Sequence, residues 1–473
     1  MRSVRAIPGV MFGALLLAAP AWAQTDSRLQ ASSGTAVSVP AVEADVPLSA
    51  QEAEKPKKPK KKAAGEEEPK NGLVWADRPS LRFGKLFQMD FRFKSQADFR
   101  QSSLDLSTRG GTFEWGRLRA GIKGSFLKYF EYEVEHDIET GGSWRDVYLN
   151  FRYDAYAQVQ GGKFKIPFGY EQLTGPMDLD FVYRTRVSDA LTPGRSVGGM
   201  VHGRAFKRVI RYQAGVFQDD GDNPPSLDPA PLLPGDPPPL PRQGSWAGRA
   251  TVAPLRLSSL PGRLNNLEVG GAIVSTTIPE GRNNLNGTMV LGDTFFHSRY
   301  YTKGRRLRVG LELSWAPGPF SVSAEYIRST DAREGVGVGN EQGLDNNLPD
   351  IEGRGWYVTG SWVVTGEKRD GGVKPRRPFL QGGFGAIEVA GRYEVLRFAS
   401  AGAPQEPPSD SLRAANVLGN GDRVFTGGVN WYLNKWLKFQ VNGIRETLDD
   451  AALSPVPGQS SFWTVVSRLQ FVL

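Results

Sequence analysis

Apolar and ionic residues alternate along unusually long stretches of this sequence. Between Leu81 and Phe99 one parity is apolar and largely aromatic, while the other carries arginine, lysine, glutamine and aspartate. The alternation recurs from Gly116 to Phe126, and again from Phe130 to Glu139, where the polar parity is acidic. Successive side chains of a β-strand point to opposite faces, so the pattern predicts long strands with one apolar face and one ionic face.

The alternation predicts about 16 strands in all, an even number. After the first three, the expected strands are 145–153, 157–166, 198–207, 211–217, 245–254, 267–276, 305–315, 320–328, 354–364, 383–395, 423–433, 436–445 and 462–473. Connections after odd-numbered strands are mostly long and those after even-numbered strands mostly short, with exceptions at 140–142 and 365–382. Long loops at one end and short turns at the other are typical of outer-membrane β-barrels.

The chemistry of a bilayer explains why such strands would close into a barrel. Backbone N–H and C=O groups inside hydrocarbon must be paired, and a sheet pairs all of them only when its last strand meets its first. The mean hydropathy of −0.37 is too low for a helical bundle, but alternation hides the lipid-facing residues from that average. We therefore expect an all-β transmembrane barrel of about 16 antiparallel strands with short periplasmic turns and long extracellular loops. A soluble β-propeller or sandwich is the alternative.

The first residues have the features of an export signal. Two arginines precede a short apolar stretch, Val10 to Ala19, which is followed by small residues in an A-x-A pattern. This is the pattern of a cleaved signal peptide, predicted here over residues 1–23. The apolar stretch is shorter than the roughly 18 residues that a spanning helix needs. We therefore expect the mature chain in the outer membrane.

A charged, proline-containing stretch follows the expected leader. Residues 24–71 contain a lysine run at 55–62 and three glutamates at 66–68, and they offer nothing to bury in a core. This composition favours a disordered periplasmic arm before a barrel domain at 72–473. A solvated linker is the plainer interpretation of the lysine run. Contact with an acidic cell-wall polymer or anionic lipid is the other.

The composition gives little support to catalysis or metal binding. The chain has no cysteine and 3 histidines, which are scattered at 136, 202 and 297 without metal-ligand spacing. No G-x-S-x-G nucleophile motif occurs in the sequence. We predict no enzymatic activity, no cofactor, no metal site and no nucleic-acid partner.

Three segments resemble the phosphate-selective porin O and P family. They are RLRAGIKG at 117–124, YEVEHD at 132–137 and, most specifically, GKFKIPFGYEQLT at 162–174. The resemblance is tight from Phe113 to about Asp219 and looser towards the C-terminus. It implies a 16-stranded barrel, usually a trimer, whose basic lumen guides anions to a constriction. It also implies that Lys163 and Lys165 belong to the constriction region, and that the solute is phosphate, polyphosphate or a similar small anion.

Basic residues on the polar parity are the candidates for lining the pore. Arginine is always charged and offers forked donors to an oxyanion, so a series of arginines supplies several weak sites instead of one trap. Besides Lys163 and Lys165, the candidates are Arg82, Arg92, Arg117, Arg119, Lys123, Arg306 and Arg308, with Asp137 as a carboxylate that tunes the choice of anion. We expect the connection 168–197, with its own three arginines, to fold inward and narrow the pore.

An acidic column leaves a second interpretation open for each of these cations. The strand after Lys123 carries a carboxylate at every second position from Glu131 to Glu139, and neighbouring strands lie about 4.8 Å apart. Each basic residue could therefore serve a structural ion pair. The net charge of +8 favours a basic, anion-selective lumen. A weakly selective general diffusion or sugar porin, and an envelope-tethering barrel that acts through its N-terminal arm, are the alternatives. The expected partners are small inorganic anions, outer-membrane lipid and further copies of the chain in a homotrimer.

Overall fold

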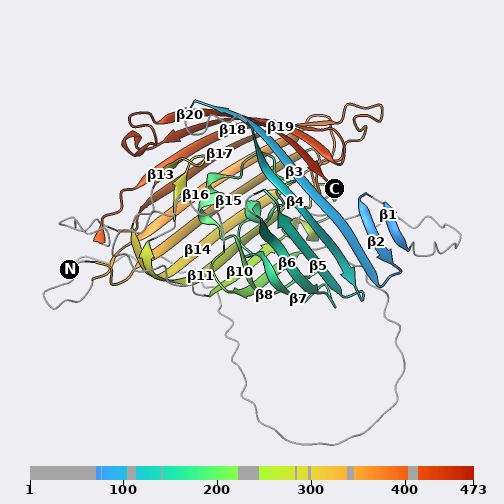
Figure 1. Ribbon diagram of the computed structural model, residues 1–473, viewed down its shortest axis with the longest axis horizontal. Coiled ribbons are helices and arrows are strands. Elements are labelled where there is room, and N and C mark those ends of the chain that lie inside the picture. The colour runs from blue at the N-terminus through green and yellow to red at the C-terminus, as the bar shows by residue number, and fades with distance from the viewer. Residues whose placement is uncertain are drawn as a thin grey trace, which may run out of the picture. The chain divides into compact units, whose positions relative to one another are not determined.

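Strands make up most of the computed structural model (Figure 1). It describes residues 71–75, 77–103, 113–139, 142–221, 244–282, 285–296, 300–337, 346–402 and 414–473. The expected signal peptide and all but the last residue of the expected arm lie outside these ranges. Among the described residues no helix has the length and apolar character to cross a membrane.

Sixteen of the eighteen strands in the main sheet form a closed wall. They are β3 (Phe87–Ser102), β4 (Phe113–Phe126), β5 (Phe130–Asp137), β6 (Ser143–Phe151), β7 (Gln158–Lys165), β8 (Arg195–Ala205), β9 (Ile210–Phe217), β10 (Ser245–Val252), β11 (Glu268–Arg282), β14 (Tyr301–Trp315), β15 (Phe320–Arg333), β16 (Leu348–Val363), β17 (Ala386–Ser400), β18 (Asn420–Tyr432), β19 (Leu437–Leu448) and β20 (Ser461–Val472). Each strand pairs antiparallel with the next, and β20 pairs with β3. The predicted barrel and its strand number are confirmed.

The two ends of the barrel differ as the sequence predicts. Connections at one end, which we call the turn end, are mostly short, such as 127–129, 206–209, 316–319 and 433–436, with longer ones at 253–267 and 364–385. The opposite end, which we call the loop end, carries the long connections, including 166–194 and 449–460. In outer-membrane barrels the short turns are periplasmic and the long loops extracellular.

The first expected strand is in fact two strands, so this part of the prediction is wrong. A tight turn at Gly84, whose φ of 54° suits glycine, separates β2 (Pro79–Phe83) from β3. Strand β2 pairs with β1 (Gly72–Trp75) and with the turn-end part of β3, beside the place where β20 stops. The alternation conceals the turn because Phe83 and Phe87 keep the same parity on either side of it.

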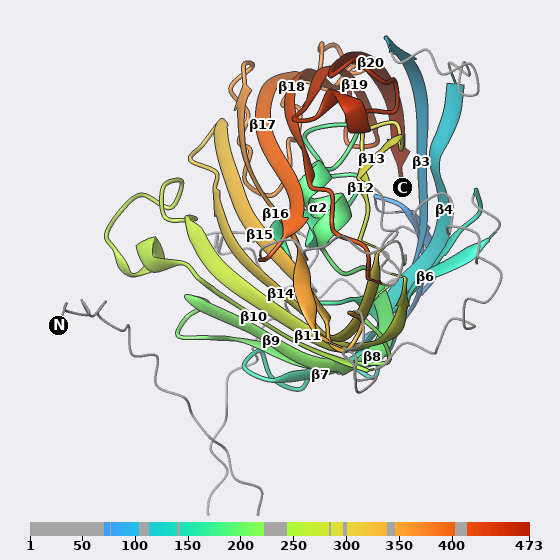
Figure 2. The same cartoon turned by 90° about the vertical axis from the view of Figure 1, so that its left-hand side faces the viewer.

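Two connections at the loop end contribute structure inside the ring of strands (Figure 2). The first, residues 166–194, contains α1 (Tyr170–Leu173) and α2 (Arg186–Leu191). The second contains the short strand pair β12 (Gly287–Thr288) and β13 (Thr294–Phe296). Two 3-10 turns, η1 (Pro254–Leu257) and η3 (Ala451–Leu453), lie on other connections. The inward segments share an apolar cluster with the wall that includes Ile166, Phe168, Val187, Leu191, Met289, Phe295, Phe398 and Phe462.

Candidate functional site

The connection between β7 and β8, residues 166–194, narrows the lumen, and we call it the inward connection. Its helix α2 packs against β15, β16, β17 and β12. The sequence pattern favours this course because Ile166, Phe168, Val187 and Leu191 are apolar and become fully buried inside the barrel. The expectation that this connection folds inward is confirmed. Inside the barrel the connection follows the wall formed by β15 to β20.

A buried carboxylate of the wall holds the start of the inward connection. Glu325 of β15 accepts hydrogen bonds from the backbone N–H groups of Tyr170 and Glu171, at 2.6 and 2.9 Å, and from the Tyr357 hydroxyl at 2.6 Å. Buried backbone donors need such partners, because an unpaired one costs about 1 to 3 kcal/mol. Glu325 is therefore an anchor of the constriction.

A second set of anchors binds the middle of the inward connection. Gln96 of β3 donates to the carbonyl of Pro176 at 3.2 Å, and Gln470 of β20 donates to that of Met177 at 3.0 Å. Asn442 of β19 accepts from the N–H of Val182 at 2.7 Å. These anchors hold the segment against one side of the lumen.

Three cationic side chains lie close together at the inward connection. Lys165 Nζ donates to the carbonyl of Gln172 at 2.5 Å, and Arg184 donates to that of Thr174 at 2.8 Å. Arg117 donates to the Gln96 side chain at 2.7 Å. Arg184 is an electrostatic neighbour of both Arg117 and Lys165. We call Arg117, Lys165 and Arg184 the cation cluster.

The cation cluster differs from the ion-paired candidates of the wall in its lack of a carboxylate partner among the described residues. Within the described part of the chain none of the three forms an ion pair at 4.0 Å or less, although all are only half-buried. Burial lowers the pKa of the Arg184 guanidinium, and the nearby carboxyls of Glu171 and Asp189 act in the opposite direction. Arginine stays protonated even so. The cluster is thus a positive centre whose charge is not cancelled by contact.

Most other predicted lumen cations form ion pairs. Arg92 and Lys123 both reach Glu133, at 2.7 and 3.1 Å. Asp137 accepts from Arg119 at 2.9 Å and from Arg145 at 3.3 Å, so this carboxylate neutralises arginines of the wall. Arg92, Arg119 and Lys123 therefore form structural ion pairs with the acidic residues of β5, which is the second of the two interpretations raised for them.

Arg306 and Arg308 of β14 belong to a separate buried network. Arg306 pairs with Asp331 at 2.6 Å and with Asp220 at 2.7 Å, and Arg308 reaches Asp220 at 3.2 Å. Both arginines are less than 10% exposed. They stand apart from the cation cluster, on another sector of the wall.

Two further candidates complete the set. Arg82 is on β2, outside the closed wall, because of the turn at Gly84. Lys163 is on β7, where it is paired in register with Val147 and Val197.

Sequence reasoning missed some of the functional architecture. Arg184 was one of three arginines in the expected inward connection, with nothing to single it out. Lys94 and Arg468 are buried lumen cations paired with Glu135 and Asp98. The run of apolar residues from Met289 to Leu291, in the long connection between β11 and β14, was an available signal for the second inward segment. The described residues contain no cluster of three potential ligands that could hold a metal ion.

Comparisons with known proteins agree with this architecture. A model of the family described as phosphate-selective porin O and P matches residues 87–473. Porin O of Pseudomonas aeruginosa is 28% identical over 176 residues, which are 34% of this chain and 34% of that protein. The match therefore spans about a third of that relative.

Solved outer-membrane proteins superimpose on the barrel with low sequence identity. The outer membrane channel DcaP of Acinetobacter baumannii gives a TM-score of 0.49 at 9% identity, covering 85% of this chain and 100% of that one. OmpT of Vibrio cholerae gives 0.48 at 11% identity, covering 83% and 99%.

Proposed function

Since the chain belongs to the phosphate-selective porin O and P family and is a porin of the outer membrane, we propose that it is anion-selective and that the cation cluster is its filter. The solutes we propose are phosphate, polyphosphate or similar small anions. The observation that supports this most directly is that, among the residues the structure describes, no carboxylate lies within 4.0 Å of the charged groups of Arg117, Lys165 and Arg184, beside a segment that narrows the lumen.

The cluster has donors to spare for a passing oxyanion. A guanidinium has five N–H donors, and Arg117 uses one of its terminal nitrogens on Gln96. Lys165 has one short contact and longer ones to the carbonyls of Leu173 and Thr174, at 3.5 and 3.3 Å. An anion can therefore exchange with weak contacts as it passes. Such exchangeable binding supports conduction, because a site must also release its ion.

The paired cations would have a different part in transport. Arg92, Lys123 and Arg119 form with their carboxylates a polar wall of low net charge. Such a wall stays wet without trapping an anion along the whole path. The same pairing is the observation that favours the weakly selective general diffusion porin as the second candidate.

Ion selectivity separates the two candidates. In a planar bilayer with a KCl gradient, we expect the reversal potential of the full chain to have the sign of chloride selectivity, because the uncancelled charge lies at the narrowing. Added phosphate should then reduce the chloride current. A reversal potential near zero would favour the general diffusion porin, and one of the opposite sign would contradict both the filter and its charge.

We also propose that the protein is a homotrimer that uses the outer face of β7 to β11. Strands β5 to β10 have 8 to 11 residues, whereas β14 to β17 have 14 to 16. The outward positions of the shorter wall include the small residues Gly161, Gly199, Ala214, Gly248 and Ala250. Small side chains allow another wall to approach closely.

A bulky residue on this face should separate the subunits. We expect Gly199→Trp to lower the mass of the detergent-solubilised protein, measured by light scattering, from that of a trimer towards that of a monomer. Val322→Trp is the control, because Val322 is exposed on the outer face of β15, away from the proposed contact. Loss of the trimer in the control alone would contradict the assignment of the face.

The last part of the proposal concerns the N-terminal residues. We propose that residues 1–23 are a leader removed on export and that 24–71 form a periplasmic arm before the barrel domain at 72–473. Apart from residue 71, the leader and the arm lie outside the described residues. Contact of the arm with the cell wall stays a prediction.

A further inference from the structure

A band of arginines runs around the outside of the barrel near the loop end. It has one member on each of six consecutive strands, from β14 to β19. We call these residues the arginine band: Arg305, Arg328, Arg354, Arg397, Arg423 and Arg445. All six side chains are exposed and lie on the parity opposite to the lumen residues.

The register of the sheet makes the band continuous. Arg328 is directly opposite Arg354, and Arg354 is directly opposite Arg397. Arg423 lies two residues further along its strand, opposite Val395, and Arg445 is opposite Phe425. Directly opposed like charges are unfavourable unless something compensates them. Two carboxylates supply part of that compensation.

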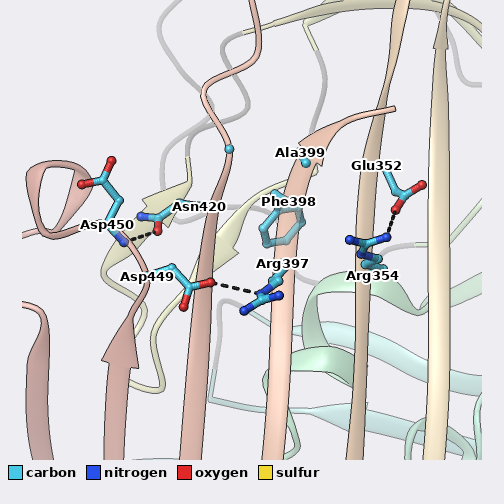
Figure 3. A pocket seen from close by; sticks show the side chains of 9 residues that line it. Glu352, Arg354, Arg397, Phe398, Ala399, Asn420, Asp449 and Asp450 are labelled. Atoms are coloured by element: carbon cyan, nitrogen blue, oxygen red, sulfur yellow. Dashed lines mark hydrogen bonds and ion pairs between the residues drawn. The ribbon is translucent and has the colours of Figure 1, made fainter. Parts of the chain in front are cut away.

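Each of these carboxylates is shared between two arginines. Glu352 contacts Arg328 at 2.5 Å and Arg354 at 3.3 Å. Asp449 contacts Arg397 at 3.1 Å (Figure 3). It also contacts Arg423 at 2.9 Å. The four guanidinium side chains are 46 to 56% exposed, whereas the carboxylates are 10 and 28% exposed. The charge presented outward is therefore positive.

Two hollows in the outer surface lie along the band. One, of about 340 Å³, is lined by Arg354 and Arg397, with Asp449 and Asp450 on its loop side. The other, of about 450 Å³, is lined by Arg305 and Arg328, with Glu334 and Asp350 also in its lining. Figure 3 shows the arginines of the first hollow on adjacent strands. Each hollow thus offers a pair of guanidinium groups to a ligand from outside the barrel.

Exposed aromatic residues lie next to the band on the same outer face. Tyr326, Trp356 and Phe425 each stand two residues from an arginine of the band, towards the turn end. The rings of Trp356 and Tyr393 lie 5.8 Å apart on neighbouring strands. Aromatic girdles mark the interfaces of a barrel with the bilayer. The arginine band is therefore at headgroup level, because an outward arginine at mid-membrane costs about 2 to 4 kcal/mol.

We propose that the arginine band binds the phosphate groups of an anionic lipid in the outer leaflet. Guanidinium groups bind phosphate oxygens through paired donors, and basic residues at the membrane surface attract anionic headgroups. The lipid lies with its acyl chains against the aromatic residues and its phosphates in the two hollows. This surface is on the opposite side of the wall from the proposed filter.

The test measures lipid binding by the full chain. Purified, delipidated protein is titrated with bisphosphorylated lipid A and with fully dephosphorylated lipid A, and binding is followed by native mass spectrometry. Arg354→Gln/Arg397→Gln should weaken binding of the phosphorylated lipid by about 30-fold, since each basic residue near a membrane surface contributes about 1 kcal/mol. Conductance should be unchanged, which separates this proposal from the proposed filter.

Matched variants define the outcome. Arg376→Gln/Arg377→Gln removes the same charge from the connection between β16 and β17 at the turn end, and should bind the lipid normally. Arg354→Lys/Arg397→Lys should retain most of the binding and shows that the fold tolerates change. Equal weakening in the turn-end variant overturns the proposal, as does equal affinity for the dephosphorylated lipid. Complete displacement by millimolar inorganic phosphate, or a changed oligomer mass, would assign the band to a free anion or to a second copy instead.

Discussion

Replacing Arg117 and Lys165 together by glutamine is expected to raise the phosphate concentration that halves the chloride current by at least about tenfold. Each residue offers a charge-assisted hydrogen bond, and such bonds contribute about 1.5 to 3 kcal/mol when both partners are present. In a water-filled lumen part of this free energy is offset, because water can replace the lost hydrogen bonds. Tenfold corresponds to about 1.4 kcal/mol for the pair, which is a conservative expectation.

The same variant should lose much of its preference for chloride over potassium. Reversal potentials in a KCl gradient and phosphate titrations of single-channel current measure the two effects. Arg117→Lys/Lys165→Arg preserves the charge and should remain anion-selective. Arg376→Gln/Arg377→Gln changes the net charge equally, but on a connection at the turn end and outside the cation cluster, so its selectivity should match that of the unmodified protein. If that variant changes selectivity as much as the cluster variant, the cluster has no special role.

Removing the Glu325 carboxylate is expected to release the inward connection. Glu325→Ala leaves the N–H groups of Tyr170 and Glu171 and the Tyr357 hydroxyl without their acceptor. Of these donors only the two N–H groups belong to the inward connection, so at about 1 kcal/mol or more for each the attached state loses roughly 2 kcal/mol, enough to raise the detached population by roughly 30-fold. Single-channel records should then show frequent steps to a higher conductance.

The control for Glu325 is a carboxylate on the preceding strand. Glu312 of β14 also faces the lumen, but it pairs with Arg249 and makes no hydrogen bond to the inward connection in the described part of the chain. Glu312→Gln should therefore keep the conductance level and its steadiness. An unchanged record for Glu325→Ala would mean that the other anchors suffice, and Glu325 would not be a determinant of pore width.

Strand number and pairing order could be predicted from the sequence because both follow from simple physics. Period-two alternation marks each crossing, and antiparallel neighbours with closure follow from the need to pair every backbone group in hydrocarbon. The alternation does not reveal a turn when the apolar residues keep the same parity on both sides of it. The turn at Gly84 could therefore not be predicted, and because of it Arg82 lies on β2, outside the wall.

The candidate site could be predicted only in part, because parity assigns a face and not a partner. Arg117 and Arg119 share one parity, yet Arg119 meets Asp137 while Arg117 meets Gln96. The difference arises because β5 ends at Asp137, so Arg117 extends beyond the acidic column. Strand ends of this kind depend on the whole sheet.

The roles of Lys163 and Lys165 could not be told apart from the sequence. The resemblance assigned both lysines to the constriction region, and in the structure Lys165 donates to the carbonyls of Gln172, Leu173 and Thr174 in the inward connection. The assignment of these two lysines to the constriction stays a prediction.

The joint between β3 and β20 has a consequence for how the porin is assembled. Its strands are far apart in the sequence, so their pairing carries a large loop-closure entropy and is expected late in folding. Gln96 and Gln470 donate to the inward connection from opposite sides of this joint, and Gln96 also donates to the side-chain oxygen of Gln470 at 2.8 Å. The constriction is therefore completed only when the wall is sealed. Closure of the wall and anchoring of the inward connection are therefore expected in the same step of assembly. An intermediate in which β3 and β20 are not yet paired would have neither a closed wall nor a fully anchored inward connection.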